Sequence, residues 1–268
     1  MDDVKFDFDP GTRSWRVTPP NLQRGLIVPD CHHPYVDRGA WQLLLKAARK
    51  IQPDTLILLG DWVDCHAVGN HPRTSPLKHT LEGELSAARF ALQELTEACG
   101  NPTQKVFIEG NHETRLNRYI MQNAPELFGM LNIETALGLE ELGWEFIPYG
   151  KSFVYGKLHL THDTGKSGMN AHRQAAAAHL SSTIIGHTHR FAYEVTGTFN
   201  GPPFLACMLG WLGDAETAGS YVHETGSAAW AKGFGLSYRE LETGIVHVTP
   251  VPIIAGKCMV EGELLSVE

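Results

Sequence analysis

Two histidines, His187 and His189, stand two residues apart after a short apolar run and a glycine. In an extended backbone, residues i and i+2 point to the same side, so both imidazoles would face one spot just past the end of a buried strand. Two convergent imidazoles can form part of a metal site, although an isolated pair more often includes a helix N-cap neighbour or a solvated loop residue. The choice depends on what other ligands the chain supplies.

The same arrangement recurs at four other places, each an apolar, strand-like run that ends in polar side chains. The runs are followed by Asp30 and His32, by Asp61 and Asp64, by Asn111, His112 and Glu113, and by His162. Open α/β sheets place their sites at the carboxyl ends of the strands. We therefore expect these loops to converge with His187 and His189.

The expected donors are carboxylate oxygens, an amide oxygen and imidazole nitrogens, and no cysteine is required. Such a set suits Mn, Fe, Zn or Ni, and it is too large for one tetrahedral ion. Two ions that share a carboxylate would lie about 3.5 to 4 Å apart, a spacing that polarises a phosphoryl oxygen and lowers the pKa of a bridging water. The predicted chemistry is hydrolysis of a phosphoester.

Alternating helices and strands must position these loops, and the hydrophobic periodicity predicts them. Asp37 can cap a helix that ends before Pro53, and further helices are predicted over residues 80–99 and 171–180. Short helices are predicted over residues 125–143 and a hairpin over 153–160. Residues 191–198, 204–208, 234–241 and 245–251 indicate antiparallel strands, which we expect to form a second sheet. The fold class is a layered α/β architecture.

Composition limits the organisation and the partners. A chain of 268 residues with 43% hydrophobic content can bury one large core, so we predict an N-terminal arm over residues 1–20 and a single domain over 21–268. A formal charge of −8 disfavours nonspecific binding to duplex DNA, which depends on a basic surface. Five widely spaced cysteines fit reduced thiols. With no signal peptide or membrane-spanning run visible, we expect a cytoplasmic protein that does not bind membranes.

Taken in order, the five ligand groups resemble the motifs of the calcineurin-like metallophosphoesterases. The matching strings are Asp30-x-His32, Gly60-Asp61-x-x-Asp64, Gly110-Asn111-His112-Glu113, the lone His162 and Gly186-His187-Thr188-His189. The resemblance covers roughly residues 24–191, and the whole chain is similar to the compact stand-alone members found in bacteria and their phages. It implies a four-layer α/β/β/α sandwich, in which two mixed sheets are flanked by helices.

The resemblance also implies a role for each ligand. One metal would be held by Asp30, His32, Asp61 and His189, and the other by Asp61, Asn111, His162 and His187, with Asp61 bridging. His112 would lie over the scissile phosphate and protonate the leaving oxygen, with Asp64 holding its ring. A hydroxide shared by two divalent ions would attack the phosphorus in line. We expect the ions to be Mn²⁺, with Fe, Zn or Ni as alternatives.

Further side chains are candidates for contact with the substrate. They are His33, His66, Arg115 and Arg118. The two arginines lie three residues apart on one side of a helix start, where a solvated helix face is the alternative. The loops over residues 66–79 and 211–232 could form the rim of the site, and their role is left open.

The leading prediction is a metal-dependent phosphodiesterase or phosphatase acting on a nucleotide or another small phosphoester. A nuclease acting on DNA or RNA is one alternative, disfavoured by the acidic balance. A Ser/Thr-type protein phosphatase is another, disfavoured because Cys65 and His66 stand where those enzymes have Arg-Gly. A non-catalytic metal-binding scaffold is the last, and it would be expected to lack some ligands. The substrate, the preference for diester or monoester, the native metal and the oligomeric state stay open.

Overall fold

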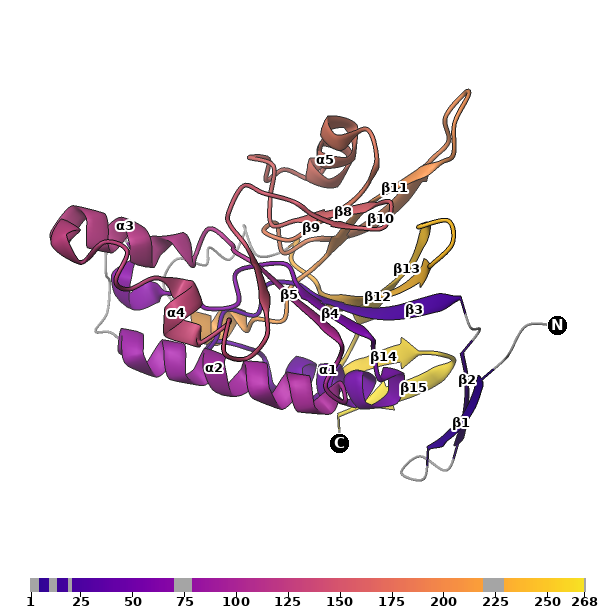
Figure 1. Ribbon diagram of the computed structural model, residues 1–268, viewed down its shortest axis with the longest axis horizontal. Helices are drawn as coiled ribbons and strands as arrows, with labels where there is room; N and C mark the ends of the chain where they lie inside the picture. Colours follow the sequence, from indigo (N-terminus) through magenta and orange to yellow (C-terminus); the bar gives the residue numbers. More distant parts are fainter. Residues whose placement is uncertain (1–4, 10–13, 19–20, 70–78, 219–228, 268) are drawn as a thin grey trace.

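Two β-sheets lie face to face, and helices cover the outer side of each (Figure 1). The computed structural model describes residues 5–9, 14–18, 21–69, 79–218 and 229–267. Within these residues the layers follow the order α/β/β/α. The expected four-layer sandwich with two mixed sheets is therefore confirmed.

The first sheet has six strands, in the order β13-β12-β3-β4-β5-β6. Their bounds are β3 (Leu22–Val28), β4 (Thr55–Leu58), β5 (Gln104–Ile108), β6 (Glu145–Ile147), β12 (Lys232–Glu240) and β13 (Val246–Ile253). Strands β3 to β6 are parallel, whereas β12 pairs antiparallel with β3 and β13 pairs antiparallel with β12. The expectation that residues 234–241 and 245–251 join a second sheet was wrong. These strands cover the edge of β3, which would otherwise expose unpaired backbone groups beside the core.

The second sheet has five strands, in the order β10-β11-β9-β8-β7. Their bounds are β7 (Phe153–Tyr155), β8 (Leu158–Thr161), β9 (Ser182–Ile185), β10 (Phe191–Thr196) and β11 (Phe204–Leu209). Strands β8, β9 and β11 run parallel, and the two outer strands are antiparallel to their neighbours. The predicted strands over 191–198 and 204–208 do lie in a second sheet. Because β8 and β9 lie there too, the ligand loops come from both sheets.

Neighbouring residues of the central strands face different layers. Ile27 and Ile57 lie between the two sheets, where they join Leu160 and Ile184 of the second sheet. Leu26, adjacent to Ile27, instead belongs to the core on the helix side of the first sheet. Side chains alternate along a strand, so a strand buried on both faces must be apolar at successive positions. This explains the continuous apolar runs that precede the ligands.

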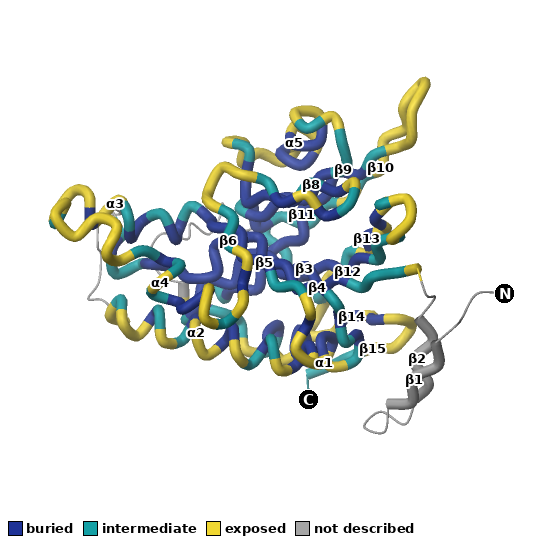
Figure 2. The backbone as a smooth tube through the Cα atoms, viewed as in Figure 1, coloured by how far each residue is buried: buried dark blue, intermediate teal, exposed yellow. Residues whose placement is uncertain are grey.

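Two long helices cover the first sheet and one shorter helix covers the second (Figure 1). They are α1 (Arg38–Ile51), α2 (Leu81–Ala98) and α5 (Ala171–His179). The side chains of Asp37 and Thr80 accept hydrogen bonds from the backbone N–H groups of Ala40 and Gly83. These caps fix the helix starts where the sequence predicts them. Buried residues follow the strands through both sheets, and exposed residues lie on the outer sides of the helices (Figure 2).

Shorter elements complete the described chain. They are the hairpin β1 (Lys5–Asp9) and β2 (Ser14–Thr18), the hairpin β14 (Lys257–Val260) and β15 (Glu263–Ser266), the 3₁₀ turns η1 (His66–Val68) and η2 (Pro125–Leu127), and the helices α3 (Thr114–Asn123), α4 (Ile133–Leu137) and α6 (Ala215–Ala218). η2 and α4 confirm the short helices predicted over residues 125–143. Among the described helices, none is both long enough and apolar enough to cross a membrane.

Candidate metal centre

The seven predicted metal ligands meet at the carboxyl ends of strands from both sheets. One group of ligand atoms comes from Asp30, His32, Asp61 and His189, and a second comes from Asp61, His162 and His187. A third group joins His32 to Asp64 and His112, and within each group the ligand atoms lie within 4.8 Å of one another. Asp61 belongs to the first two groups, and the residues of all three are buried except for the half-buried His187. These buried His/Asp groups are consistent with a binuclear metal site.

In the first group the ligand atoms point at one another. The Nε2 atoms of His32 and His189 lie 3.0 Å apart, and Nε2 of His189 lies 3.1 Å from Oδ2 of Asp30. A neutral imidazole carries one proton. The two facing nitrogens and the carboxylate therefore cannot all form good hydrogen bonds with one another, whereas one cation can bind all three atoms. Nitrogen and oxygen atoms that converge in this way fit the donor set of a divalent transition metal.

The second group is centred on the amide of Asn111. Its Oδ1 lies 2.9 Å from Nε2 of His162 and 2.8 Å from Nδ1 of His187. Nε2 of His162 lies 3.4 Å from Oδ2 of Asp61, and Nε2 of His32 lies 3.9 Å from the same oxygen. The Asp61 carboxylate is thus approached from both groups, as a bridging ligand would be.

The backbone around the ligands is strained. His32, Asp61, His187 and His189 have φ values of 53°, 48°, 67° and 56°. Side chains with a Cβ rarely adopt this left-handed region, and such residues concentrate at functional sites. At Gly186, a Cβ atom would lie only 2.5 Å from Oδ1 of Asp30, so no larger residue allows the two loops to approach. The tight loops aim the ligands at the expense of local backbone energy.

Glu113 ties two ligand loops together, a role that the sequence analysis missed. Its Oε2 accepts hydrogen bonds from the backbone N–H groups of Asp61 (3.0 Å) and Gly110 (2.9 Å), and its Oε1 accepts one from Val63 (2.8 Å). Burial raises the pKa of the Glu113 carboxyl to about 7. Its place in the Gly-Asn-His-Glu string marks the residue, but nothing in the spacing reveals its partners.

His112 lies beside the centre and is held by Asp64. Its Nδ1 lies 2.7 Å from Oδ1 and 3.0 Å from the backbone oxygen of Asp64. The same Oδ1 lies 3.0 Å from Nδ1 of His32. Although burial opposes ionisation, hydrogen bonds to His112 and His32 hold the pKa of Asp64 well below its usual range. One carboxylate therefore orients both a predicted ligand and the predicted acid.

The two candidate arginines have separate surroundings. Arg115 is buried, with its Nη2 2.9 Å from Nε2 of His112, and its Nη1 donates to the backbone oxygen of Asp64 at 2.9 Å. Arg118 is exposed and donates to Oγ1 of Thr114 at 3.3 Å. The solvated helix face expected as the alternative holds for Arg118. Arg115 instead lies against His112 and Asp64.

The two candidate histidines also differ. The side chain of His66 is 24% exposed, and its Nδ1 lies 4.0 Å from Oδ2 of Asp64, which places the ring at the rim. His33 is buried against the rings of Trp41 and Trp62, at centroid distances of 5.1 and 4.7 Å. Burial lowers the pKa of His33 to about 3. Contact between His33 and a substrate does not fit this position in the core.

Two tryptophans flank His189 and were not among the predicted site residues. The ring of Trp211 is stacked on that of His189, and Trp230 meets it edge-on. Both lie within the loop over residues 211–232 that was considered for the rim. The remaining parts of the two candidate rim loops, residues 70–78 and 219–228, lie outside the described residues.

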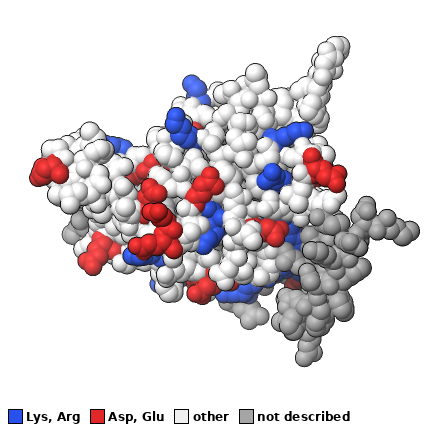
Figure 3. Space-filling model, in the orientation of Figure 1, with Lys and Arg blue, Asp and Glu red and all other residues white. Residues whose placement is uncertain are grey.

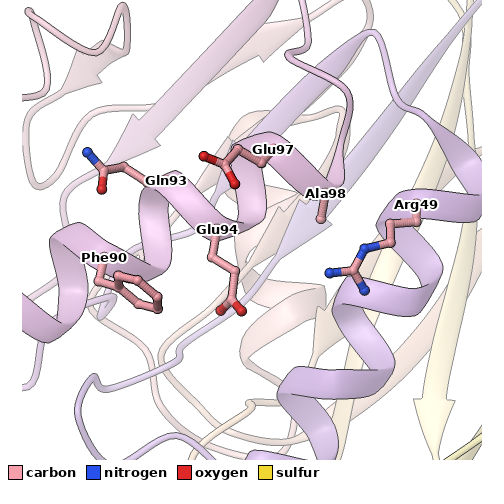
Figure 4. A pocket seen from close by; sticks show the side chains of 6 residues that line it. All are labelled: Arg49, Phe90, Gln93, Glu94, Glu97 and Ala98. Atoms are coloured by element: carbon pink, nitrogen blue, oxygen red, sulfur yellow. The ribbon is translucent and has the colours of Figure 1, made fainter.

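A hollow of about 390 Å³ lies elsewhere, between α1 and α2 (Figure 4). It is lined by Arg49, Phe90, Gln93, Glu94, Glu97 and Ala98, none of which belongs to the ligand groups.

On the face seen in Figure 3, acidic and basic side chains are interspersed, and no continuous basic stripe crosses the described residues there. The candidate site is therefore identified by its converging ligands.

The chain is similar to one protein family and to proteins of known sequence or structure. A family model described as calcineurin-like phosphoesterase matches residues 24–205, more than half of the chain. Gene 54 protein of Mycobacterium phage D29 is 26% identical over 263 residues, which cover 91% of this chain and 99% of that protein. Vacuolar protein sorting 29 of Cryptosporidium parvum is similar in structure, with a TM-score of 0.46 at 13% identity, covering 92% of this chain and 100% of that one. Vps29 of Chaetomium thermophilum has a TM-score of 0.40 at 12% identity, covering 85% and 96%. The residues matched by the family model include every ligand loop described above.

Proposed function

The chain belongs to the calcineurin-like phosphoesterase family, and on that premise we propose that it hydrolyses phosphoesters with the help of two divalent cations. The observation that carries the proposal is the pair of ligand groups that share Asp61 beside a histidine, His112, that lies outside both groups. A non-catalytic scaffold would be expected to lack some ligands or His112, and none of these residues is missing from the sequence.

In this proposal the first ion is held by Asp30, His32, Asp61 and His189, and the second by Asp61, Asn111, His162 and His187. The donor set suits Mn²⁺, with Fe, Zn and Ni as alternatives. When bound, the two ions would withdraw electron density from the phosphoryl oxygens and lower the pKa of a water molecule between them. Glu113 would keep the loops of Asp61 and Asn111 in register.

His112 would deliver a proton to the leaving oxygen. Here Arg115 donates to its Nε2, and a guanidinium can only donate, so Nε2 is the acceptor and the ring proton lies on Nδ1, facing Asp64. A phosphate oxygen is a stronger acceptor for a guanidinium than an imidazole nitrogen is. An entering phosphoester would therefore draw Arg115 onto its own oxygens and release Nε2. The free Nε2 would then take a proton from solvent, the ionised Asp64 would stabilise the resulting imidazolium through Nδ1–H, and Nε2 would pass that proton to the leaving oxygen.

The substrate we favour is a nucleotide or another small phosphoester. The interspersed charges of the face in Figure 3 give no support to a long nucleic-acid track. A phosphoprotein substrate stays the less favoured alternative, because Cys65 and His66 stand where the Ser/Thr-type protein phosphatases have Arg-Gly. Arg115 does, however, bring a guanidinium next to His112.

The test is a hydrolysis screen of Mn²⁺-loaded protein with a matched pair of nitrophenyl monoester and diester substrates, and with single-stranded DNA and a phosphopeptide. Asp61→Ala, which removes the shared ligand, is the blank. We expect turnover of at least one small ester, absent from the blank. Failure of the wild-type chain with each of Mn²⁺, Fe²⁺, Zn²⁺ and Ni²⁺ would contradict the proposal and favour a non-catalytic scaffold.

A further inference from the structure

His189 lies in a cage of two tryptophans. The rings of His189 and Trp211 are stacked, with centroids 4.7 Å apart and an interplanar angle of 10°. Trp230 meets His189 edge-on, at 4.3 Å and 81°, and Trp211 at 4.8 Å and 71°. The three rings thus fix one another in two perpendicular directions.

The backbone builds this cage from three separate segments. The N–H of Ala231 donates to the backbone oxygen of His189 at 2.9 Å, and the N–H of Trp211 donates to the oxygen of Ala231 at 3.0 Å. At Gly210, with a φ of 79°, a Cβ atom would lie 2.2 Å from the oxygen of Ala231. Only glycine permits this approach, so the backbone holds the three segments together.

His189 differs from two other ligand histidines in what holds its second nitrogen. Nδ1 of His32 lies 3.0 Å from the Asp64 carboxylate, and Nδ1 of His162 lies 2.8 Å from the backbone oxygen of Leu59. Nδ1 of His189 is buried and has no hydrogen-bond partner among the residues that the structure describes. A metal-binding histidine ordinarily donates this N–H to an acceptor, which fixes the plane of the ring.

We infer that Trp211 and Trp230 are positioning residues that orient His189 by ring packing, where His32 and His162 are oriented by hydrogen bonds. Their packing directs Nε2 of His189 toward Asp30 and His32. The inference rests on the proposed function, because it assigns the cage to one of the two metal positions. Ordinary core packing would instead stabilise the whole fold and leave the relative affinities of the two ions unchanged.

The test is binding of Mn²⁺ alone, measured by titration calorimetry on the full chain. Trp230→Leu removes the flat ring and keeps a smaller apolar side chain at this half-buried position. We expect the affinity for one of the two ions to fall about 10- to 100-fold, as when an outer partner of a ligand histidine is removed. The other ion should be affected about threefold at most, and Trp230→Phe should restore most of the loss. The ratio of the two affinities is a property of the folded molecules, so a general loss of stability does not imitate the effect.

The matched control is Trp144→Leu, at a buried tryptophan that immediately precedes β6 at the opposite end of the strands and packs against Lys105. It should lower the thermal unfolding temperature and leave both Mn²⁺ affinities unchanged. Wild-type affinities in Trp230→Leu, equal weakening of both ions, or no rescue by Trp230→Phe would each overturn the inference. A wild-type chain that binds none of Mn²⁺, Fe²⁺, Zn²⁺ and Ni²⁺ would overturn the proposed function and the cage together.

Discussion

The metal centre and the hollow between α1 and α2 both gather charged side chains, but only the centre buries them. Asp30, Asp61 and Asp64 are 0%, 1% and 0% exposed, whereas Arg49 and Glu97 of the hollow are exposed. Burying a charge costs several kcal/mol unless a partner compensates for it. Charged groups on an open surface carry no such cost. The difference teaches that burial of charge at converging strand ends identifies the site, whereas the volume of a hollow does not.

The largest effect should come from the side chain that the proposal places next to the reacting atoms. His112→Ala removes the proton donor without removing a ligand, so kcat should fall by about 10² to 10⁴. Metal content, measured by mass spectrometry of the purified protein, should equal that of the wild type. Full turnover in this variant would remove His112 from the mechanism.

The two arginines sharpen the comparison within one helix. Arg115→Ala should lower kcat/KM by about 10²-fold, the effect of losing one positioned donor to a developing charge. Arg115→Lys should rescue little, because a single ammonium cannot reproduce the guanidinium fork that contacts both His112 and Asp64.

Arg118→Ala is the control, since Arg118 lies on the exposed face of the same helix. Its kcat/KM should stay within about twofold of the wild type, because an isolated surface charge contributes little. Equal losses in Arg115→Ala and Arg118→Ala would contradict the separate roles given to the two residues.

Glu84 is a buried carboxyl outside the ligand groups, and it tests how burial changes the ionisation of a carboxyl. Its Oε1 accepts from the N–H of Ala67 at 3.2 Å, and burial, with a smaller contribution from Asp64, raises the pKa of Glu84 to about 8. An unfolded glutamate titrates near pH 4.3. Between these values the folded state binds more protons, so this group makes the wild type less stable as pH rises, by up to about 1.4 kcal/mol per pH unit.

Glu84→Gln has no proton to lose there. Relative to the wild type, its free energy of unfolding should therefore rise between about pH 5 and pH 8. Urea unfolding of the two metal-free proteins at both pH values measures the change. The difference between the proteins at a single pH includes other effects of the substitution, so the informative result is its change with pH. A difference that does not change with pH would show that Glu84 is ionised in the folded state.

The smallest effect is expected in the hollow. The carboxylate of Glu94 accepts a hydrogen bond from Nε1 of Trp41 at 2.7 Å. In the Glu94→Gln variant the amide oxygen can accept the same hydrogen bond. The free energy of unfolding should change by less than about 1 kcal/mol. Mn²⁺ affinity and turnover should be unchanged. A loss of activity here would break the comparison by giving the hollow a functional role.

The parts that follow from local sequence were predicted well. Asp37 and Thr80 cap helices that begin where the spacing indicates, because a cap and a helical face are determined within a few residues. The ligand loops could be located because each follows an apolar strand, and parallel strands deliver their carboxyl ends to a common edge. The assignment of each ligand to an ion came from the family resemblance and stays a prediction.

The parts that depend on distant partners were not predictable in the same way. β12 pairs with β3 and not with the second sheet. That pairing depends on which strand edge would otherwise be exposed, and it cannot be predicted from the residues of β12 alone. Arg115 and Arg118 share a helix and a charge, yet only the folded neighbours decide that one is buried against His112. The contacts of Glu113 and the packing of Trp230 on His189 likewise join segments far apart in the chain.

The most direct test of the two-ion centre is anomalous diffraction from crystals of the protein soaked in Mn²⁺. Two peaks about 3.5 to 4 Å apart are expected, the distance at which one carboxylate bridges two ions. Asp61 should lie between the peaks, with His112 bound to neither. A single peak, or two peaks that do not share Asp61, would contradict a dinuclear phosphoester hydrolase.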